Sequence, residues 1–292
     1  MRPSLALLAA ALITAAPAPA SAQPDAPAPG QRVVLITGST SGLGREVALA
    51  LGAAGDHVIV HGRSEERGSA VVDSIRALGG SARFVRADFA SLADITAMAE
   101  QIDSDYDRLD VLVNNAGIWL EGPRQLSDDG HELHFQVNYL ATWLLTESLS
   151  VLLQRSAPAR VVNVASIAQQ PLDFDDVMLE SGYSDGRAYA QSKLAQIMIT
   201  RVHAEALEDS GVTVNALHPA TMMDTNMVLS RGAQARASVD EGAEALLHLI
   251  NAPNLGTGGY FNGMQPARPH DQAFDAEALA RLVELSEEWT GR

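Results

Sequence analysis

The chain has 292 residues, with 36 acidic side chains against 20 basic ones and a formal charge of −16. A hydrophobic fraction of 47% and a charged fraction of 19% are typical of a globular protein. The acidic balance argues against nucleic acid and anionic membrane surfaces as partners, because both attract basic surfaces. The absence of cysteine excludes disulfides, thiolate metal sites and cysteine nucleophiles. Lys193 is the only lysine, and every other basic residue is arginine.

The N-terminal residues differ from the rest in composition. An apolar run over 5–16 is followed by Ala-Ser-Ala at 20–22, the small-x-small form of a cleavage site. The run is shorter than the roughly 20 residues that span a bilayer. We therefore expect a signal peptide at 1–22, a Pro/Ala-rich linker at 23–30 and one folded domain at 31–292.

This N-terminus predicts an exported protein, periplasmic or secreted, with no stable membrane span after cleavage. The alternatives are an uncleaved anchor and a misassigned start, which would leave the protein membrane-anchored or cytoplasmic.

From residue 32 onward, short apolar runs alternate with longer helical patterns. The runs are continuous, as in strands buried on both faces of a parallel sheet. The expected strands are Val33–Ile36, Val58–Val60, Ala82–Val85, Leu109–Val113, Val161–Val164 and Val212–Leu217. The expected helices lie near Leu43–Ala54, Glu65–Leu78, Leu92–Asp103, His131–Gln154 and Ala188–Glu208. The C-terminal part adds a helix near Ala243–Ile250, a strand at Gly259–Phe261 and a helix near Ala276–Trp289. This alternation predicts an α/β fold, a single-domain doubly wound parallel sheet.

A glycine-rich turn, TGSTSGLG at 37–44, separates the first strand from the first helix. Glycines let the backbone turn tightly and approach a pyrophosphate, and the helix N-terminus offers unpaired N–H groups to that anion. We therefore predict a dinucleotide site of the Rossmann fold, with a merely structural turn as the alternative. The residues assigned to this site are Thr37, Gly38, Ser41, Gly42, Leu43 and Gly44.

The ends of the second and third strands bear on the choice of cofactor. NAD-binding sheets carry an acidic side chain near the end of the second strand, whereas this chain has Arg63 there. A guanidinium can donate two parallel hydrogen bonds to a 2′-phosphate, so we expect NADP(H) rather than NAD. The alternative is that Arg63 is only a solvated surface residue. Asp88, after the third strand, is expected to accept from the adenine amino group or to cap the next helix, where Ser91 is the better N-cap.

Tyr189 and Lys193 are four residues apart in a helical pattern and therefore share one face. A free tyrosine has a pKa of about 10, and a nearby ammonium favours the phenolate. Lowering that pKa by about 3 units requires roughly 4 kcal/mol of differential interaction. The pair predicts a phenol that donates a proton to a carbonyl oxygen as hydride arrives, or accepts one from an alcohol in reverse.

At this point the sequence resembles the short-chain dehydrogenase/reductase family over about residues 32–263. The motifs that carry the resemblance are TGSTSGLG at 37–44, Asp88, NNAG at 114–117, Asn138 in VNYL, Ser166 in VVNVAS, YAQSK at 189–193 and HPAT at 218–221. The resemblance implies that 31–292 is a catalytic domain of an oxidoreductase. A catalytically silent NADP-binding regulator of the same fold is the alternative, although it should have lost Tyr189, Lys193 or Ser166.

The resemblance implies a role for each matched residue of the catalytic group. Tyr189 resembles the general acid/base, and Lys193 would lower its pKa and hold the nicotinamide ribose. Ser166 would hydrogen-bond the substrate oxygen and steady its developing charge. Asn138 would hold a water that links Lys193 to solvent.

Two further motifs are implied to border the cofactor. In NNAG, Asn115 and Gly117 are expected near the cofactor and Asn114 is expected to be structural. In HPAT, Pro219 and Thr221 are the matched positions.

The chain departs from the family beside HPAT, where Ala220 replaces a glycine and Asp224 replaces a threonine. Alanine is acceptable there only without a positive φ. Thr221 and Thr225 are both candidates for contacting the carboxamide.

The long insert between Ser166 and Tyr189, SKLA at 192–195 and GVTVNALHP at 211–219 are similar to retinol-dehydrogenase-like members. This subgroup implies an apolar aldehyde or ketone, or the corresponding alcohol, as small-molecule substrate, with NADP(H). It leaves a homo-oligomer open. Tyr183 in the insert lacks a lysine four residues later and is interpreted as packing.

Other candidate sites are weaker. His131 and His134 lack the His-Glu-x-x-His spacing and a third ligand, so we expect no metal. Residues 222, 223 and 227 are methionines, which suit either an adaptable apolar pocket or ordinary packing. A sugar-nucleotide epimerase shares the Tyr–Lys pair, but the chain has no room for its larger C-terminal domain.

Overall fold

A computed structural model of the chain describes residues 26–292. The predicted signal peptide at 1–22 and the first part of the predicted linker lie outside these residues. Within 26–292 none of the helices combines the length and the apolar character that crossing a membrane requires.

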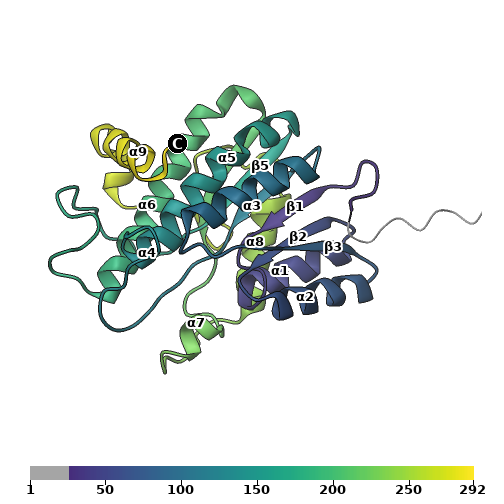
Figure 1. Ribbon diagram of the computed structural model, residues 1–292, viewed down its shortest axis with the longest axis horizontal. Coiled ribbons are helices and arrows are strands. Elements are labelled where there is room, and N and C mark those ends of the chain that lie inside the picture. Colours follow the sequence, from purple (N-terminus) through teal and green to yellow (C-terminus); the bar gives the residue numbers. More distant parts are fainter. Residues whose placement is uncertain (1–25) are drawn as a thin grey trace, which may run out of the picture.

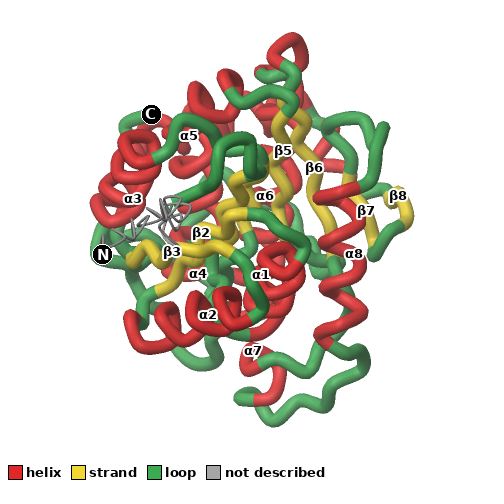
Figure 2. Tube along the Cα trace, turned by 90° about the vertical axis from the view of Figure 1, so that its right-hand side faces the viewer, coloured by secondary structure: helices red, strands yellow, loops and turns green. Residues whose placement is uncertain are grey.

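One eight-stranded sheet runs through the molecule in the order β3-β2-β1-β4-β5-β6-β7-β8 (Figures 1 and 2). All neighbouring strands are parallel except β7 and β8, which are antiparallel. The strands are β1 Val33–Ile36, β2 His57–Gly62, β3 Ser81–Arg86, β4 Val111–Asn114, β5 Ala159–Val164, β6 Val212–His218, β7 Tyr260–Asn262 and β8 Gln265–Ala267. The predicted doubly wound sheet is confirmed, and the strand order reverses between β1 and β4, where such sheets form a ligand crevice.

Helices cover both faces of the sheet, with α1, α2 and α8 on one side and α3, α5 and α6 on the other (Figure 1). The longer helices are α1 Gly42–Ala53, α2 Glu65–Ala77, α3 Leu92–Asp105, α5 Ala141–Arg155, α6 Asp185–Ala206, α8 Val239–Asn251 and α9 Ala276–Thr290. The short ones are α4 Leu133–Phe135 and α7 Asn226–Leu229.

The continuous apolar runs follow from burial of both faces. Val33 and Leu35 of β1 belong to the core under α3, α5 and α6, whereas Val34 and Ile36 belong to the core under α1, α2 and α8. Successive side chains of a strand point to opposite faces, so both sets of β1 side chains are apolar.

The helix predicted over His131–Gln154 is interrupted in the structure. The side chain of Glu132 accepts from the N–H groups of His134 and Phe135 and so starts α4 there. A π-helical turn, Gln136–Leu140, then precedes α5. π-helical turns are frequent at functional sites, and this one contains Asn138.

The segment 219–238, between β6 and α8, is called the β6–α8 segment below. It contains α7, and a bridge between Met223 and Ala237 draws its two halves together. Figure 2 shows that α7 projects away from the sheet. Its N-cap residue, Thr225, lies against Gly42 at the start of α1.

Candidate active site

The glycine-rich turn is tied to the loop that follows β4. Thr37 Oγ1 accepts hydrogen bonds from the N–H groups of Asn115 and Ala116, both at 2.9 Å. Asn115 Nδ2 in turn donates to Thr37 O at 2.7 Å. The carboxyl ends of β1 and β4 are thereby joined at the crevice, as the two motifs predict.

Two glycines of this turn lie where their surroundings leave no space for a side chain. Gly38 has φ +65, and a Cβ on it would lie 2.9 Å from Ala116 Cα. A Cβ on Gly44 would lie 2.5 Å from Asn115 Nδ2 and 2.7 Å from Gly38 O. The N-cap residue of α1, Ser41, makes no cap hydrogen bond with its side chain. The bare helix N-terminus and the close-packed turn therefore suit a pyrophosphate.

His61 supports the same turn, a role that was not predicted from the sequence. Its Nδ1 accepts from Gly38 N at 3.1 Å, and its Nε2 lies 3.3 Å from Ala87 O. These partners assign a neutral ring with its proton on Nε2. Burial lowers the pKa of His61 to about 4. The imidazole thus joins the glycine-rich turn to the end of β3.

Arg63 and Asp88 lie together at the ends of β2 and β3, with 3.7 Å between Nη1 and Oδ2. Both side chains are exposed, Arg63 by 65% and Asp88 by 40%, so a ligand can reach them. Asp88 Oδ1 accepts from Ala90 N, while Ser91 caps α3 by accepting from Asp94 N. The interpretation of Ser91 as the N-cap is confirmed, and Asp88 keeps Oδ2 on the side of Arg63.

Lys193 is buried beside Tyr189 on α6. Its Nζ donates to Val164 O at 2.8 Å and to Gln196 Oε1 at 3.0 Å, and it lies 5.9 Å from the centroid of the Tyr189 ring. Burial lowers the pKa of Lys193 to about 7, because the ammonium is removed from water.

Ser166 lies close enough to the Tyr189 phenol to act on its pKa. Burial raises the pKa of Tyr189, and this effect outweighs the Ser166 hydroxyl and the positive charge of Arg231, which both lower it. The expected lowering of the Tyr189 pKa is therefore not seen in the protein alone. Desolvation favours the neutral phenol.

Asn138 and Gly117 lie against this pair. Asn138 Oδ1 accepts from Ile118 N at 2.8 Å, and its Nδ2 donates to Ser192 Oγ at 2.9 Å. A Cβ on Gly117 would lie 3.2 Å from Asn138 Oδ1 and 3.4 Å from Lys193 Nζ. Asn138 therefore connects the loop after β4 directly to α6, next to the lysine.

Asn114 is buried within the sheet, where its Nδ2 donates to Asn163 Oδ1 and to Thr146 Oγ1. Its interpretation as a structural residue is confirmed.

The two candidate threonines that follow β6 and Pro219 lie in different places. Thr221 Oγ1 lies 2.9 Å from His218 Nε2, whereas Thr225 lies against the glycine-rich turn, 3.2 Å from where a Cβ on Gly42 would be. Within 26–292 the non-glycine residues with positive φ are Leu179, Met222 and Asn254. The alanine at 220 is thus free of the strain that a glycine-type backbone would impose.

A sequence model of the family described as short chain dehydrogenase matches residues 32–236. The chain belongs to this family of short-chain dehydrogenases/reductases. It is 34% identical to retinol dehydrogenase 13 of Mus musculus over 273 residues, which cover 86% of this chain and 81% of the relative. It is 38% identical to polyprenol dehydrogenase of Mus musculus over 279 residues, which cover 88% and 82%.

Among solved structures, an uncharacterised protein of Mycobacterium paratuberculosis superimposes with a TM-score of 0.75 at 31% identity, covering 91% of this chain and 96% of that chain. This match supports the fold, and the family model with the relatives shows an oxidoreductase of the retinol-dehydrogenase-like subgroup. The family binds NAD(P), which fits the crevice described above.

Three more side chains of this dehydrogenase surround Tyr189, and none of them was predicted from the sequence. The Trp119 ring is stacked on the Tyr189 ring, with 4.4 Å between centroids. Arg231 lies over the other face of Trp119. Tyr260 Oη donates to Ser166 O at 3.0 Å. Each comes from a different loop or strand, and none has a local sequence pattern that points to Tyr189.

The candidate metal pair and one candidate methionine have packing partners. His131 Nδ1 lies 2.7 Å from Gln136 Oε1, and His134 Nδ1 lies 2.8 Å from Glu132 Oε1. The described part of the chain contains no group of three residues that is suited to hold a metal ion. Met223 packs against the core on the α1 and α8 side.

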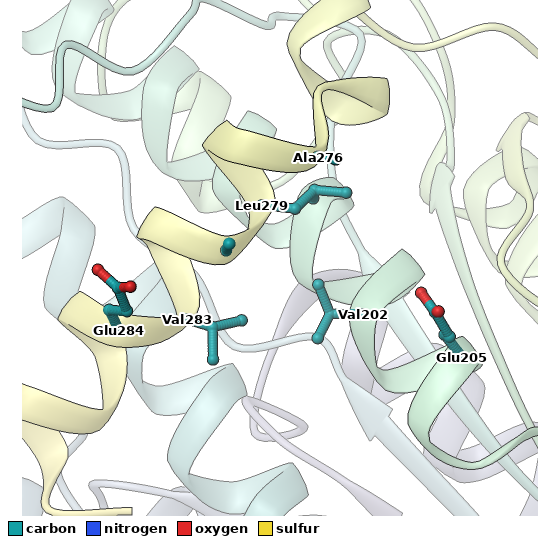
Figure 3. A pocket seen from close by; sticks show the side chains of 7 residues that line it. Val202, Glu205, Ala276, Leu279, Val283 and Glu284 are labelled. Carbon is teal, nitrogen blue, oxygen red and sulfur yellow. The ribbon is translucent and has the colours of Figure 1, made fainter.

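A surface pocket of about 450 Å³ lies between α6 and α9 (Figure 3). Its lining is mainly apolar, with Val202 of α6 facing Leu279 and Val283 of α9 and with Glu205 and Glu284 at its rim. It shares no lining residue with the group around Tyr189.

Proposed function

We propose that this dehydrogenase transfers hydride between NADP(H) and an apolar aldehyde or ketone, or the corresponding alcohol, with Tyr189 as general acid/base. The observation that carries the proposal is the convergence of Tyr189, Ser166 and Lys193 beside a loop that is bonded to the glycine-rich turn. A cofactor-binding regulator without catalysis would have no use for this arrangement. The bound nicotinamide supplies the hydride.

Tyr189 holds the proton that the reaction needs. Because burial raises its pKa, the phenol is neutral before reaction and can donate to a carbonyl oxygen. Ser166 lies beside the phenol, so its hydroxyl can donate to the same oxygen and stabilise its developing charge.

Lys193 has a fixed position and a compact charge beside the phenol. Its hydrogen bonds to Val164 O, on β5, and to Gln196 Oε1, on α6, hold the ammonium in place. When Tyr189 gives up its proton, this charge stabilises the phenolate that remains. A diol such as a ribose is a suitable acceptor for the remaining N–H of the ammonium.

Arg63 supports NADP(H) as the cofactor. Its exposed guanidinium stands at the end of β2, where an NAD-specific site would carry an acidic side chain. A 2′-phosphate would take the guanidinium's hydrogen bonds bidentately, with Asp88 left to the adenine. The relatives named retinol dehydrogenase and polyprenol dehydrogenase support an alcohol–carbonyl substrate pair.

The test is to follow the absorbance of NADPH with purified protein across a panel of apolar aldehydes and ketones, and to repeat it with NADH. We expect turnover with at least one carbonyl and a preference for NADPH. Absence of turnover together with absence of NADPH binding would contradict the proposal, whereas a preference for NADH would contradict only the assignment of Arg63.

A further inference from the structure

Three planar groups lie one on another at Tyr189. The Tyr189 and Trp119 rings are nearly parallel, with 10° between their planes and 4.4 Å between their centroids. The guanidinium carbon of Arg231 lies 3.5 Å from the centroid of the Trp119 ring. The stack therefore covers one face of the phenol with an indole and then with a cation.

The backbone on either side of Trp119 is anchored. Ile118 both donates to and accepts from the side-chain amide of Asn138. Leu120 N donates to His134 Nε2 at 2.9 Å, and His134 is in turn held by Glu132. The indole is thus presented to Tyr189 by a loop that is fixed at both of its neighbours.

The indole N–H does not explain this placement. Trp119 Nε1 is buried and has no hydrogen-bond partner within the described part of the chain. A buried donor without a hydrogen-bond partner loses the free energy of its hydration, so the indole N–H destabilises the observed position of the ring. Stacking on Tyr189 and beneath Arg231 supplies the compensating attraction.

Arg231 brings the β6–α8 segment onto the site. Its Nε lies 3.1 Å from Glu121 Oε1, in the loop after β4, and its Nη2 lies 3.8 Å from Asp185 Oδ2, in the first residue of α6. The Arg231 side chain is only 16% exposed. One guanidinium therefore joins the segment, the loop and the helix that carries Tyr189.

We propose that Arg231 and Trp119 are positioning residues, which hold the phenol ring of Tyr189 and shield its face from water when the β6–α8 segment lies over the site. This inference rests on the proposed role of Tyr189 as acid/base. With its face covered, the phenol offers only its Oη edge to the substrate. Removing Arg231 should therefore impair turnover without touching the dinucleotide crevice.

Arg231→Ala and Arg236→Ala form a matched pair, since both remove one guanidinium from the same segment and Arg236 is exposed. We expect Arg231→Ala to lower kcat about tenfold, with the Kd of NADPH changed less than about twofold. Arg236→Ala should match the wild type, and Arg231→Lys should recover only part of the loss, because an ammonium does not stack as a plane.

Fluorescence reports the stack independently of turnover. The emission of Trp119 is obtained, in each background, as the difference between the protein with and without Trp119→Phe. In the Arg231→Ala background this emission should shift to the red, and acrylamide should quench it more strongly. Trp119→Phe should retain most activity, whereas Trp119→Ala should resemble Arg231→Ala. Wild-type rates and unchanged emission in Arg231→Ala would overturn the inference, while a wild type without any turnover would instead overturn the proposed function.

Discussion

Acidification should destabilise this dehydrogenase through His61. The imidazole is buried, and Gly38 N–H already donates to its Nδ1, so a proton on that nitrogen would replace an acceptor with a second donor. The folded protein therefore resists protonation, and burial lowers the pKa of His61 from 6.5 to about 4.

The sign and size of the effect follow from linkage. Above pH 6.5 the side chain is neutral in both the folded and the unfolded chain, and its contribution is fully present. Between pH 6.5 and about 4 the unfolded chain binds a proton that the folded chain does not, so stability falls as the pH falls. The loss is about 2 kcal/mol at pH 5 and approaches about 3 kcal/mol below pH 4.

Urea unfolding followed by circular dichroism between pH 7.5 and 4 measures this loss in wild type and in His61→Asn. The asparagine places an acceptor near the position of Nδ1 but does not titrate, so the pH dependence should become shallower by about 2 kcal/mol at pH 5. His57 is a matched control, since burial also lowers its pKa to about 4, but it lies at the start of β2. His57→Gln should alter acid stability and leave NADPH affinity unchanged. Identical pH dependence in wild type and His61→Asn would refute the reasoning.

Three substitutions test the other parts of the site. Lys193→Arg should lower kcat about 100-fold, because a forked guanidinium does not fit the ammonium's place, and near-normal rates would show that charge alone suffices. Arg63→Ala should raise the Kd of NADPH about tenfold and leave that of NADH unchanged, whereas equal losses would exclude a 2′-phosphate contact. Gly44→Ala should cost about 1–3 kcal/mol in unfolding free energy and weaken NADPH binding, because its Cβ would meet Asn115 Nδ2 at 2.5 Å. Its control is Gly186→Ala, which would meet nothing within 4 Å and should be neutral.

The sheet was predictable because burial on both faces leaves a plain signature. Val33 to Ile36 are all apolar since alternate residues enter different cores, and the apolar residues of the other long parallel strands divide between the same two cores. Short strands with little apolar content carry no such signature. β8, which contains Gln265 and Pro266 and is largely exposed, was therefore missed.

Residues that act through distant partners were less predictable. Tyr189 and Lys193 share a helix face, so their proximity follows from spacing alone. Trp119 and Arg231 meet only because the loop after β4 and the β6–α8 segment converge on α6. The π-helical turn at Asn138 likewise depends on a shift in hydrogen bonding that has no signature in composition.

The central claim is that Tyr189 transfers the proton during hydride transfer between NADP(H) and a carbonyl. The most direct measurement compares NADPH oxidation by wild type and Tyr189→Phe with a carbonyl that the wild type reduces, alongside the Kd of NADPH. Removal of the phenolic oxygen should lower kcat about 1,000-fold and leave the Kd within about twofold, because the ring and its stacking partner remain. A variant that turns over at the wild-type rate would contradict the assignment.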